Sequence, residues 1–485
     1  MNELKKAINW IQVKFIAMFS NTAILFVITA LIFGSIFILS TPSLWGVDGA
    51  TQFARAYQIS EGHILSEKVP ISKGGGYGGK IPANIVELWG LVQNNLEHLP
   101  SNEFSNHQFI NQSSQFLVEH QKLSTKQEYF NFSNTAAYSP IVYIPSVIGI
   151  EIAHTINANI QWTILLGRMA DLLFYILCVY LAIKALISTK AKWIIFSVAL
   201  IPMALYQASI INADATTNAI AILFAALFIK TVFLKKQLTK LETILLFISI
   251  ATIPIIKPTY IFIAFLVLII PNKMLRGKKA GIYKFCALII GILAFIMWTY
   301  LTRGAANDIR LLRSGANLVD VHKQASYIIG NSLLSLLVLP RTLLLNDNAY
   351  MLSFFGTLGF SFIQIPAIAI ISSISALVIS ILIAEEWIIS KLNIIFTLLV
   401  LAACVVAVFV TLYLTFTPVG YPTIQGVQGR YFIPLAALML VCVSIFRLRL
   451  KQDNSTNKLS ALAIPTLVVI SLASSALEFI YVLHG

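Results

Sequence analysis

The sequence predicts an all-α membrane protein, a polytopic helix bundle that forms one domain over residues 1–485. Hydrophobic residues make up 58% of the chain, charged residues only 11%, and the mean hydropathy is +0.83. Soluble globular proteins carry about 25% charged residues. Apolar stretches of roughly 20 residues, enough to cross a hydrocarbon core ~30 Å thick, recur along the chain. These observations exclude a soluble globular protein.

About eleven membrane-spanning helices are expected. Their order follows the apolar stretches, and the charged loops between them set their ends. The expected spans are residues 21–40, 162–187, 193–211, 216–234, 241–257, 259–271, 281–301, 366–389, 392–415, 431–447 and 458–483.

The positions of lysine and arginine predict a cytoplasmic N-terminus, because short cytoplasmic loops are enriched in these residues. With that orientation the cytoplasmic segments hold Lys5, Lys6, Lys14, Lys184, Lys190, Lys192, Lys230, Lys235, Lys236, Lys240, Lys273, Arg276, Lys278, Lys279, Lys284, Lys391, Arg447, Arg449, Lys451 and Lys458. The pattern requires that residues 139–154 and 328–345 do not cross. Counting both as spans is the alternative, and it would place Lys190, Lys192, Lys235 and Lys236 outside.

Two long extracytoplasmic loops follow from this topology, residues 41–161 and 302–365. The first is polar and is expected to hold short amphipathic, interfacial helices. Within it, 139–154 contains two prolines together with Glu151 and His154, which is a poor composition for a spanning helix. In the second loop, 328–345 contains Pro340 before Arg341, which favours a broken, re-entrant or interfacial helix.

Several other functional classes find no support in the sequence. Residues 74–80 (GGGYGGK) fit the start of a phosphate-binding loop, but Ile81 replaces the hydroxyl that would hold magnesium, so a flexible loop is expected. The four cysteines lie in apolar stretches and the histidines show no zinc-binding spacing, so we expect no disulfide framework, metal or cofactor. The net charge of +14 is assigned to membrane orientation rather than to nucleic-acid binding.

Polar residues that are unusual next to lipid collect on the extracytoplasmic face of this topology. An ionisable group at membrane depth costs a few kcal/mol and is usually paired or functional. Helix capping and interfacial anchoring remain the alternative for each residue alone. Together they predict a polar site formed by Asp48, Arg168, Asn212, Asp214, Lys257, Gln428, Arg430 and Tyr431.

Six segments resemble a known fold family. They are residues 53–62 (FARAYQISEG) after Asp48, 138–143 (YSPIVY), 206–214 (YQASIINAD), 257–258 (KP), 355–359 (FGTLG) and 428–434 (QGRYFIP). Their order and spacing resemble an uncharacterised bacterial membrane-protein family related to the GT-C glycosyltransferases. The length of the chain and its general sequence character are also similar to those of phage serotype-converting O-antigen glucosyltransferases. The resemblance covers residues 40–440.

This resemblance implies sugar transfer, with glucose as the expected sugar, from a polyprenyl-phosphate carrier to an extracytoplasmic glycan such as the O-antigen of lipopolysaccharide. The reaction would take place at the periplasmic face of a bacterial inner membrane. Asp48 would be the general base of a metal-independent, inverting displacement. Arg430 would bind the donor phosphate, with Lys257 and Arg168 as second choices. Substrate-binding residues would be Asp214, Asn212, Tyr57, Tyr138, Tyr431 and Gln428.

The sequence departs from the family pattern in one respect. An acidic pair often follows the first span, whereas Gly49 follows Asp48 here, which puts two-carboxylate and metal-assisted schemes in doubt. An O-antigen polymerase or ligase, or a transporter or flippase of lipid-linked sugars, stays open as an alternative. Besides membrane lipid, the resemblance implies a small flippase and a carrier-loading glycosyltransferase as partners, and no nucleic acid.

Overall fold

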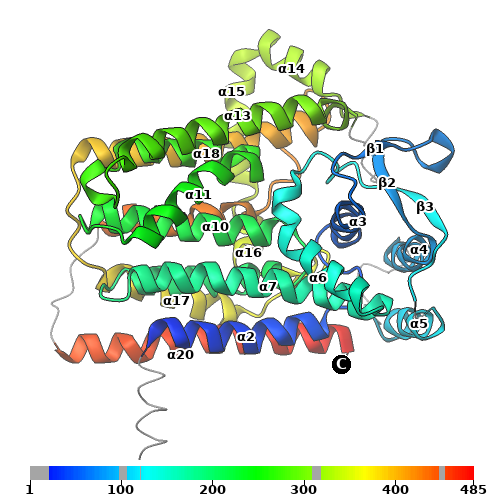
Figure 1. Cartoon of the computed structure of the whole chain (residues 1–485), viewed down its shortest axis with the longest axis horizontal. Helices are drawn as coiled ribbons and strands as arrows, with labels where there is room; N and C mark the ends of the chain where they lie inside the picture. The colour runs from blue at the N-terminus through cyan, green and yellow to red at the C-terminus, as the bar shows by residue number, and fades with distance from the viewer. Residues whose placement is uncertain (1–20, 98–105, 121, 309–317, 447–453, 485) are drawn as a thin grey trace, which may run out of the picture.

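The computed structural model describes residues 21–97, 106–120, 122–308, 318–446 and 454–484 as a mostly helical protein (Figure 1). Long helices run side by side along the longest axis, and a smaller region with short strands lies at one end of them. Six helices are long and apolar enough to cross a membrane, or seven if one bent pair forms a span. They comprise α2 (Thr22–Ser40), α7 (Ile160–Ala185), α10 (Ala213–Phe228, continued by a π-helical turn to Phe233), α13 (Ala280–Asn307), α18 (Lys391–Thr415) and α20 (Asn454–His484).

The protein is therefore a multi-pass membrane protein with six to seven candidate spans. The remaining expected spans contain shorter helices, so eleven crossings stays a prediction. These helices are α8 (Lys192–Ala199), α9 (Pro202–Ala208), α11 (Lys240–Ile256), α12 (Ile261–Ala264), α17 (Ala367–Ile383) and α19 (Ile433–Ser444).

Two of the expected spans are not continuous helices. The stretch 193–211 is divided into α8 and α9 at Pro202, which has no backbone N–H to continue the helical hydrogen bonding. The stretch 259–271 contains only the single turn of α12 between two 3-10 segments, Pro258–Tyr260 and Phe265–Ile269. Both breaks lie among packed helices, where neighbouring elements can compensate for lost hydrogen bonds.

Helix α10 lies at the centre of the bundle. Of its candidate span, 94% is buried inside the protein, whereas only 28% of the span in α13 is buried. Its small residues let α7, α11 and α19 pack around it. The N-terminus of α10 is thereby held at the centre of the bundle end that carries the small strands.

The first outer loop is not purely helical, which corrects the all-α expectation. It contains helices α3 (Gly49–Ser60), α4 (Ala83–Glu97), α5 (Asn106–Glu119) and α6 (Ile144–Thr155), and strands β1 (Glu67–Lys68), β2 (Tyr77–Pro82) and β3 (Gln127–Asn131). The strands form an antiparallel sheet of order β1-β2-β3.

The glycine-rich segment 74–80 was expected to be a flexible loop, and that expectation is wrong. Its second half forms β2, the central strand of the sheet, where Gly78 pairs with Asn131. A Cβ atom at Gly78 would lie 1.9 Å from the backbone oxygen of Phe130. Glycine is needed here because the strands approach so closely.

The expected interfacial segment 139–154 forms a 3-10 turn, Pro140–Tyr143, followed by α6, which packs along α7. At 12 residues, α6 is about 18 Å long, which is too short to cross a bilayer alone. Its position relative to the membrane stays a prediction.

The second outer loop contains α14 (Val321–Gly330) and α15 (Ser332–Leu345), which are bent by 109° relative to each other. They are followed by α16 (Asp347–Phe355) and a two-stranded hairpin, β4 (Thr357–Leu358) and β5 (Ile363–Gln364). The break lies at Asn331 and not at Pro340, which is accommodated inside α15. A broken or re-entrant element agrees with the expectation, but its site was misplaced.

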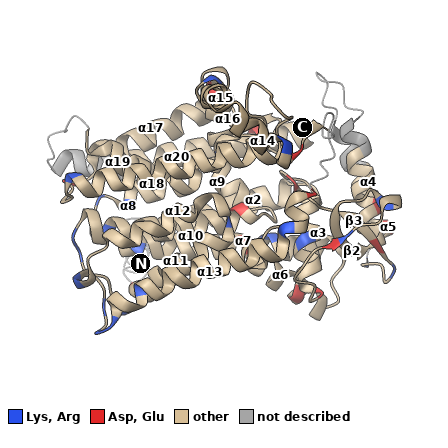
Figure 2. Ribbon diagram, turned by 90° about the horizontal axis from the view of Figure 1, so that it is seen from above, with Lys and Arg blue, Asp and Glu red and all other residues tan. Residues whose placement is uncertain are grey.

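Charged residues are distributed unequally between the two ends of the bundle. Figure 2 shows Lys and Arg gathered at the loops opposite the strand-containing end, where α7 connects to α8 and α10 to α11. Which of the two ends faces the cytoplasm stays a prediction from this distribution. Lys5, Lys6, Lys14, Arg447, Arg449 and Lys451 lie outside the described residues.

Candidate functional site

The carboxylate of Asp214 is the centre of a buried polar cluster. Asn212 is the N-cap of α10 and its side-chain oxygen accepts from the backbone N–H of Asp214 at 2.8 Å. Asp214 therefore lies in the first helical turn, where the helix dipole favours negative charge. Its Oδ2 accepts from Gln207 Nε2 at 2.7 Å and from the guanidinium of Arg430 at 3.0 Å, and its Oδ1 accepts from the ammonium of Lys257.

The two cations reach Asp214 from different parts of the chain. Lys257 directly follows α11, where Pro258 prevents the helix from continuing. Arg430 lies in the 3-10 turn Gly429–Phe432 that precedes α19. Both cations also flank the ring of Tyr431, with Lys257 Nζ at 4.8 Å and Arg430 Cζ at 4.9 Å from its centroid. Cation–π contact and ion pairing thus hold the two side chains together.

Further hydrogen bonds fix the orientation of Arg430. Its Nε donates to Gln428 Oε1 at 2.6 Å, and a terminal nitrogen lies 3.3 Å from the hydroxyl of Tyr431. The hydroxyl of Tyr260 donates to the backbone oxygen of Tyr431 at 2.6 Å. Arg430 is therefore a preorganised, buried cation rather than a mobile surface side chain.

Asp48 differs from Asp214 in both its accessibility and its partners. It precedes α3 in a left-handed backbone conformation, φ 59°, and its side chain is exposed and does not cap the helix. One oxygen, Oδ1, accepts from Asn134 Nδ2 at 3.0 Å, and the same amide lies 3.0 Å from the hydroxyl of Thr51. Asn134 thus fixes one oxygen of the carboxylate.

The protein around Asp48 raises the pKa of its carboxyl above the ordinary value. Enclosure by protein disfavours the charged form, and this effect outweighs the opposing influence of Arg430, of the Asn134 hydrogen bond and of Lys257. Because the side chain is nevertheless exposed, it can exchange protons with solvent or with a bound molecule. These are properties of a candidate general base.

Tyr138 joins the same site from the loop after β3. Burial raises the pKa of its hydroxyl to about 12, while Lys257 acts in the opposite direction, and the charges of Asp214 and Asp48 also reach it. The structure therefore brings Tyr138, Asp48, Asp214, Lys257 and Arg430 into one electrostatic neighbourhood, with Gln428, Tyr431 and Asn212 as direct partners.

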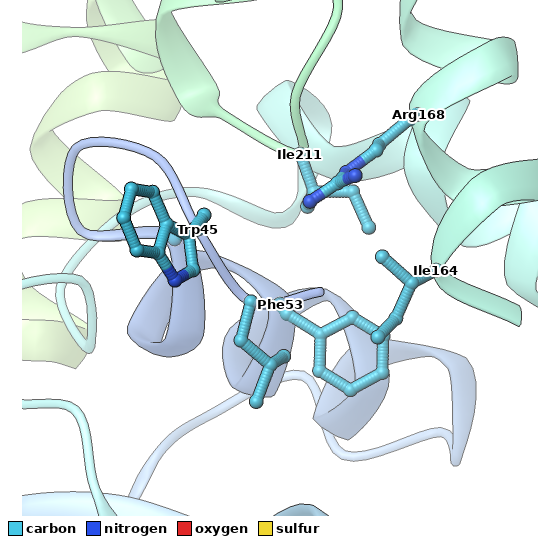
Figure 3. A pocket seen from close by; sticks show the side chains of 7 residues that line it. Trp45, Phe53, Ile164, Arg168 and Ile211 are labelled. Atoms are coloured by element: carbon cyan, nitrogen blue, oxygen red, sulfur yellow. The ribbon is translucent and has the colours of Figure 1, made fainter. Parts of the chain in front are cut away.

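Arg168 does not join this cluster. Its guanidinium donates to the backbone oxygens of Thr41 at 2.6 Å, Pro42 at 2.7 Å and Ile38 at 3.3 Å. These carbonyls lie at the end of α2 and just beyond it, where helix carbonyls lack intrahelical partners. Figure 3 shows Arg168 beside a small pocket that it lines with Leu44, Trp45, Gly49, Phe53, Ile164 and Ile211. These contacts indicate that Arg168 fixes the position of the segment that precedes Asp48.

Tyr57 also lies apart from the cluster. Its ring packs edge-on against His154, with centroids 5.5 Å apart, and lies 6.0 Å from the ring of Phe53. Burial, together with the charge of Glu61, raises the pKa of its hydroxyl. The structure therefore groups Tyr57 with α6 and the end of α3.

Three polar residues of the site were not predicted from the sequence. Gln207 donates to Asp214 and accepts from Asn218 Nδ2 at 3.1 Å, and Asn134 orients Asp48. Gln207 and Asn218 are amides inside apolar stretches, a signal that could have found them. The contact between Asn134 and Asp48 joins residues 86 positions apart, and no local pattern indicates it. Among the described residues, no three His, Cys, Asp or Glu side chains are grouped as metal ligands.

Comparison with known families decides the family of the chain. Residues 31–439 match the family described as "Predicted membrane protein (DUF2142)". The chain belongs to the DUF2142 family. No curated protein and no solved structure matches it. The matched range contains Asp48, Asp214, Lys257 and Arg430, so the clustered site lies entirely within the DUF2142 region.

Proposed function

We propose that this DUF2142 protein is a membrane glycosyltransferase. It would transfer a sugar, with glucose as the first candidate, from a polyprenyl-phosphate carrier to a glycan such as O-antigen outside the bacterial inner membrane. The observation that carries the proposal is an accessible carboxylate, Asp48, within the electrostatic influence of a buried cluster. In that cluster two cations, Lys257 and Arg430, share one carboxylate, Asp214.

The proposed role of Asp48 is that of general base. Its carboxylate takes the proton of the acceptor hydroxyl as the acceptor oxygen bonds to the anomeric carbon of the donor sugar. The bond between that carbon and the phosphate oxygen breaks, and its electrons leave with polyprenyl phosphate. A single displacement of this kind inverts the anomeric centre. Asn134 holds one carboxylate oxygen, and in this scheme the other takes the proton.

The proposed role of Arg430 and Lys257 is to stabilise the leaving phosphate. Their two positive charges against the one negative charge of Asp214 leave the cluster with a net charge of +1, which favours an incoming anion. The three hydrogen bonds described for Arg430 use three of the five N–H donors of a guanidinium. In this scheme the two side chains, rather than a metal ion, meet the charge that develops on the phosphate.

The remaining predicted residues take supporting roles in this proposal. Tyr138, Tyr431 and Gln428 would contact the sugar or orient Arg430, and Asn212 would fix Asp214 at the start of α10. The contacts of Arg168 and Tyr57 with the backbone and with α6 favour structural roles for both. A carrier-loading glycosyltransferase and a flippase would supply the donor on the outer face.

The test is transfer of radiolabelled glucose from synthetic polyprenyl-phosphate-glucose to lipopolysaccharide by the purified protein, with and without EDTA. We expect wild-type transfer to survive EDTA, and Asp48→Asn and Arg430→Ala to abolish it. Asp320→Asn is the matched control for the carboxylate, because an amide can still cap α14, and Arg303→Ala is the control for the cation, because Arg303 is exposed.

Each outcome has a separate meaning. Transfer that survives Asp48→Asn would refute the proposed base while keeping the reaction class. Loss of transfer in the two control variants would show that any charge change in the outer loops disables the protein. If wild type transfers no sugar from any carrier, the proposal fails, and polymerisation, ligation or transport of lipid-linked sugars becomes the function to test.

A further inference from the structure

The bent pair α14–α15 exposes an unusual amount of apolar surface. Ile329 and Leu333, on either side of the bend, are each 80% exposed, and Leu336 and Leu344 are 71% and 79% exposed. Both views of the protein show the pair projecting sideways from the bundle, in the half that lies toward the strand-containing end (Figures 1 and 2). It therefore does not extend beyond the ends of the long helices.

The neighbouring surface of the bundle is also apolar. Helix α18 contacts α14, and its Phe409 and Tyr413 pack with Val338 of α15. On the same helix Val406 and Val410 are exposed, as expected of a helix that faces lipid. Soluble proteins rarely expose continuous apolar patches of this kind. The one charged residue of α15, Arg341, lies near its C-terminal end, where a long side chain can reach the headgroups.

The opposite side of the pair holds the chain segment that leads to Arg430. Four backbone N–H groups of residues 419–429 donate to the second outer loop. The acceptors are the Leu318 oxygen for Val419 at 3.1 Å, Gln324 Oε1 for Gly420 at 2.9 Å, Thr342 Oγ1 for Ile424 at 2.9 Å and Ser353 Oγ for Gly429 at 2.7 Å. Helices α14, α15 and α16 each contribute one of these acceptors.

The last of these contacts is immediately next to Arg430. A Cβ atom at position 429 would lie 1.9 Å from the backbone oxygen of Tyr350 and 2.6 Å from the backbone nitrogen of Phe354. Glycine thus lets the Arg430 turn lie directly against α16. Displacement of the second outer loop would therefore displace the guanidinium of Arg430.

We propose that α14–α15 is inserted into the outer leaflet of the membrane and, through α16, positions Arg430 relative to the lipid surface. The occupant of its apolar face is lipid acyl chain, because that face adjoins the exposed apolar residues of α18, which is a candidate membrane span. This inference goes beyond the proposed function, since it holds whatever reaction Arg430 serves.

The first test measures lipid contact directly. Leu336→Cys in a Cys286→Ser background is labelled with the fluorophore NBD in proteoliposomes, and Ile71→Cys is the matched control, because Ile71 is 84% exposed on the sheet-containing loop. At position 336 we expect blue-shifted emission that doxyl-labelled lipids quench and aqueous iodide does not. At position 71 we expect the reverse. Iodide quenching at 336, or cross-linking of two copies through that cysteine, would overturn the proposal.

The second test measures the coupling to Arg430. Hydrogen–deuterium exchange of residues 419–429 is compared in nanodiscs between wild type, a Leu333→Asp/Leu336→Asp double variant and Ile71→Asp. Carboxylates at 333 and 336 disfavour insertion. We expect about tenfold faster exchange in the double variant, as for loss of about one hydrogen bond, and no change in Ile71→Asp. Unchanged exchange in the double variant, despite loss of lipid contact, would refute the positioning role. Neither test requires transferase activity, so each can fail independently of the proposed function.

Discussion

Replacing Asp214 with asparagine removes the one carboxylate that the two buried cations share. The side chain of Arg430 is 4% exposed, that of Lys257 13% and that of Asp214 10%, so neither cation can be fully hydrated after the change. Removing one partner of a buried ion pair costs about 3–5 kcal/mol. Because Asp214→Asn removes the carboxylate partner of two cations at once, we expect a loss of unfolding free energy at the upper end of that range.

Reversible unfolding in mixed detergent micelles measures this loss. The matched control is Glu242→Gln, which breaks the pair of Glu242 with Lys230 at 2.7 Å, where one carboxylate serves one cation and both side chains are 14% exposed. We expect this control variant to lose less unfolding free energy than Asp214→Asn. The double variant Asp214→Asn/Lys257→Met should lose less than the sum of its single variants, because the methionine leaves no charge behind. An Asp214→Asn variant within about 1 kcal/mol of wild type, or one no less stable than Glu242→Gln, would refute the reasoning.

Three shorter predictions follow from individual contacts. Asn134→Ala removes a hydrogen bond that lowers the pKa of Asp48, so the acid limb of the transfer rate should move to higher pH, and a limb that stays in place would argue against Asp48 as the base. Gly429→Ala brings a methyl group to 1.9 Å from a backbone oxygen of α16, and we expect a loss of at least about 2 kcal/mol in unfolding free energy. For topology, a membrane-impermeant maleimide should label Lys73→Cys in intact spheroplasts but Lys278→Cys only after permeabilisation. Equal labelling of the two would contradict the predicted orientation.

The sequence could predict the helices of the bundle because lipid imposes a simple rule on composition. Each crossing needs a long apolar stretch, and α2, α7, α13 and α18 follow the expected ranges within a few residues. The rule says nothing about where such a stretch breaks. The division at Pro202 and the bend at Asn331 depend on which neighbours can satisfy the freed backbone groups. Predicting the second break from the position of proline was wrong, because Pro340 is accommodated inside α15.

The residues of the site could be predicted from the sequence more readily than the contacts between them. Asp214, Lys257 and Arg430 stand out as ionisable residues at the ends of apolar stretches, and burial makes such residues find partners. Arg168 met the same criterion, yet its partners are backbone oxygens beyond the end of α2. A sequence cannot distinguish these two outcomes, because both place a cation at the end of a helix. The distinction depends on which distant segment approaches the side chain.

The two carboxylates of the site have opposite environments, and this contrast separates their roles. Asp214 accepts from two cations and Gln207, so its charge is required by its partners. Asp48 is exposed, accepts from the amide of Asn134, and has a raised pKa. A raised pKa means that the folded protein binds the proton more tightly than the unfolded chain. The stability that Asp48 contributes is therefore present below its ordinary pKa and is lost as the pH rises through the raised value. At pH 7 we expect Asp48→Asn to unfold at the same or a higher denaturant concentration than wild type, in contrast to Asp214→Asn. In the proposed reaction the charge of Asp48 serves the bound acceptor rather than the fold. If Asp48→Asn proved as destabilising as Asp214→Asn, Asp48 would be a second structural anion, and the site would have no accessible base.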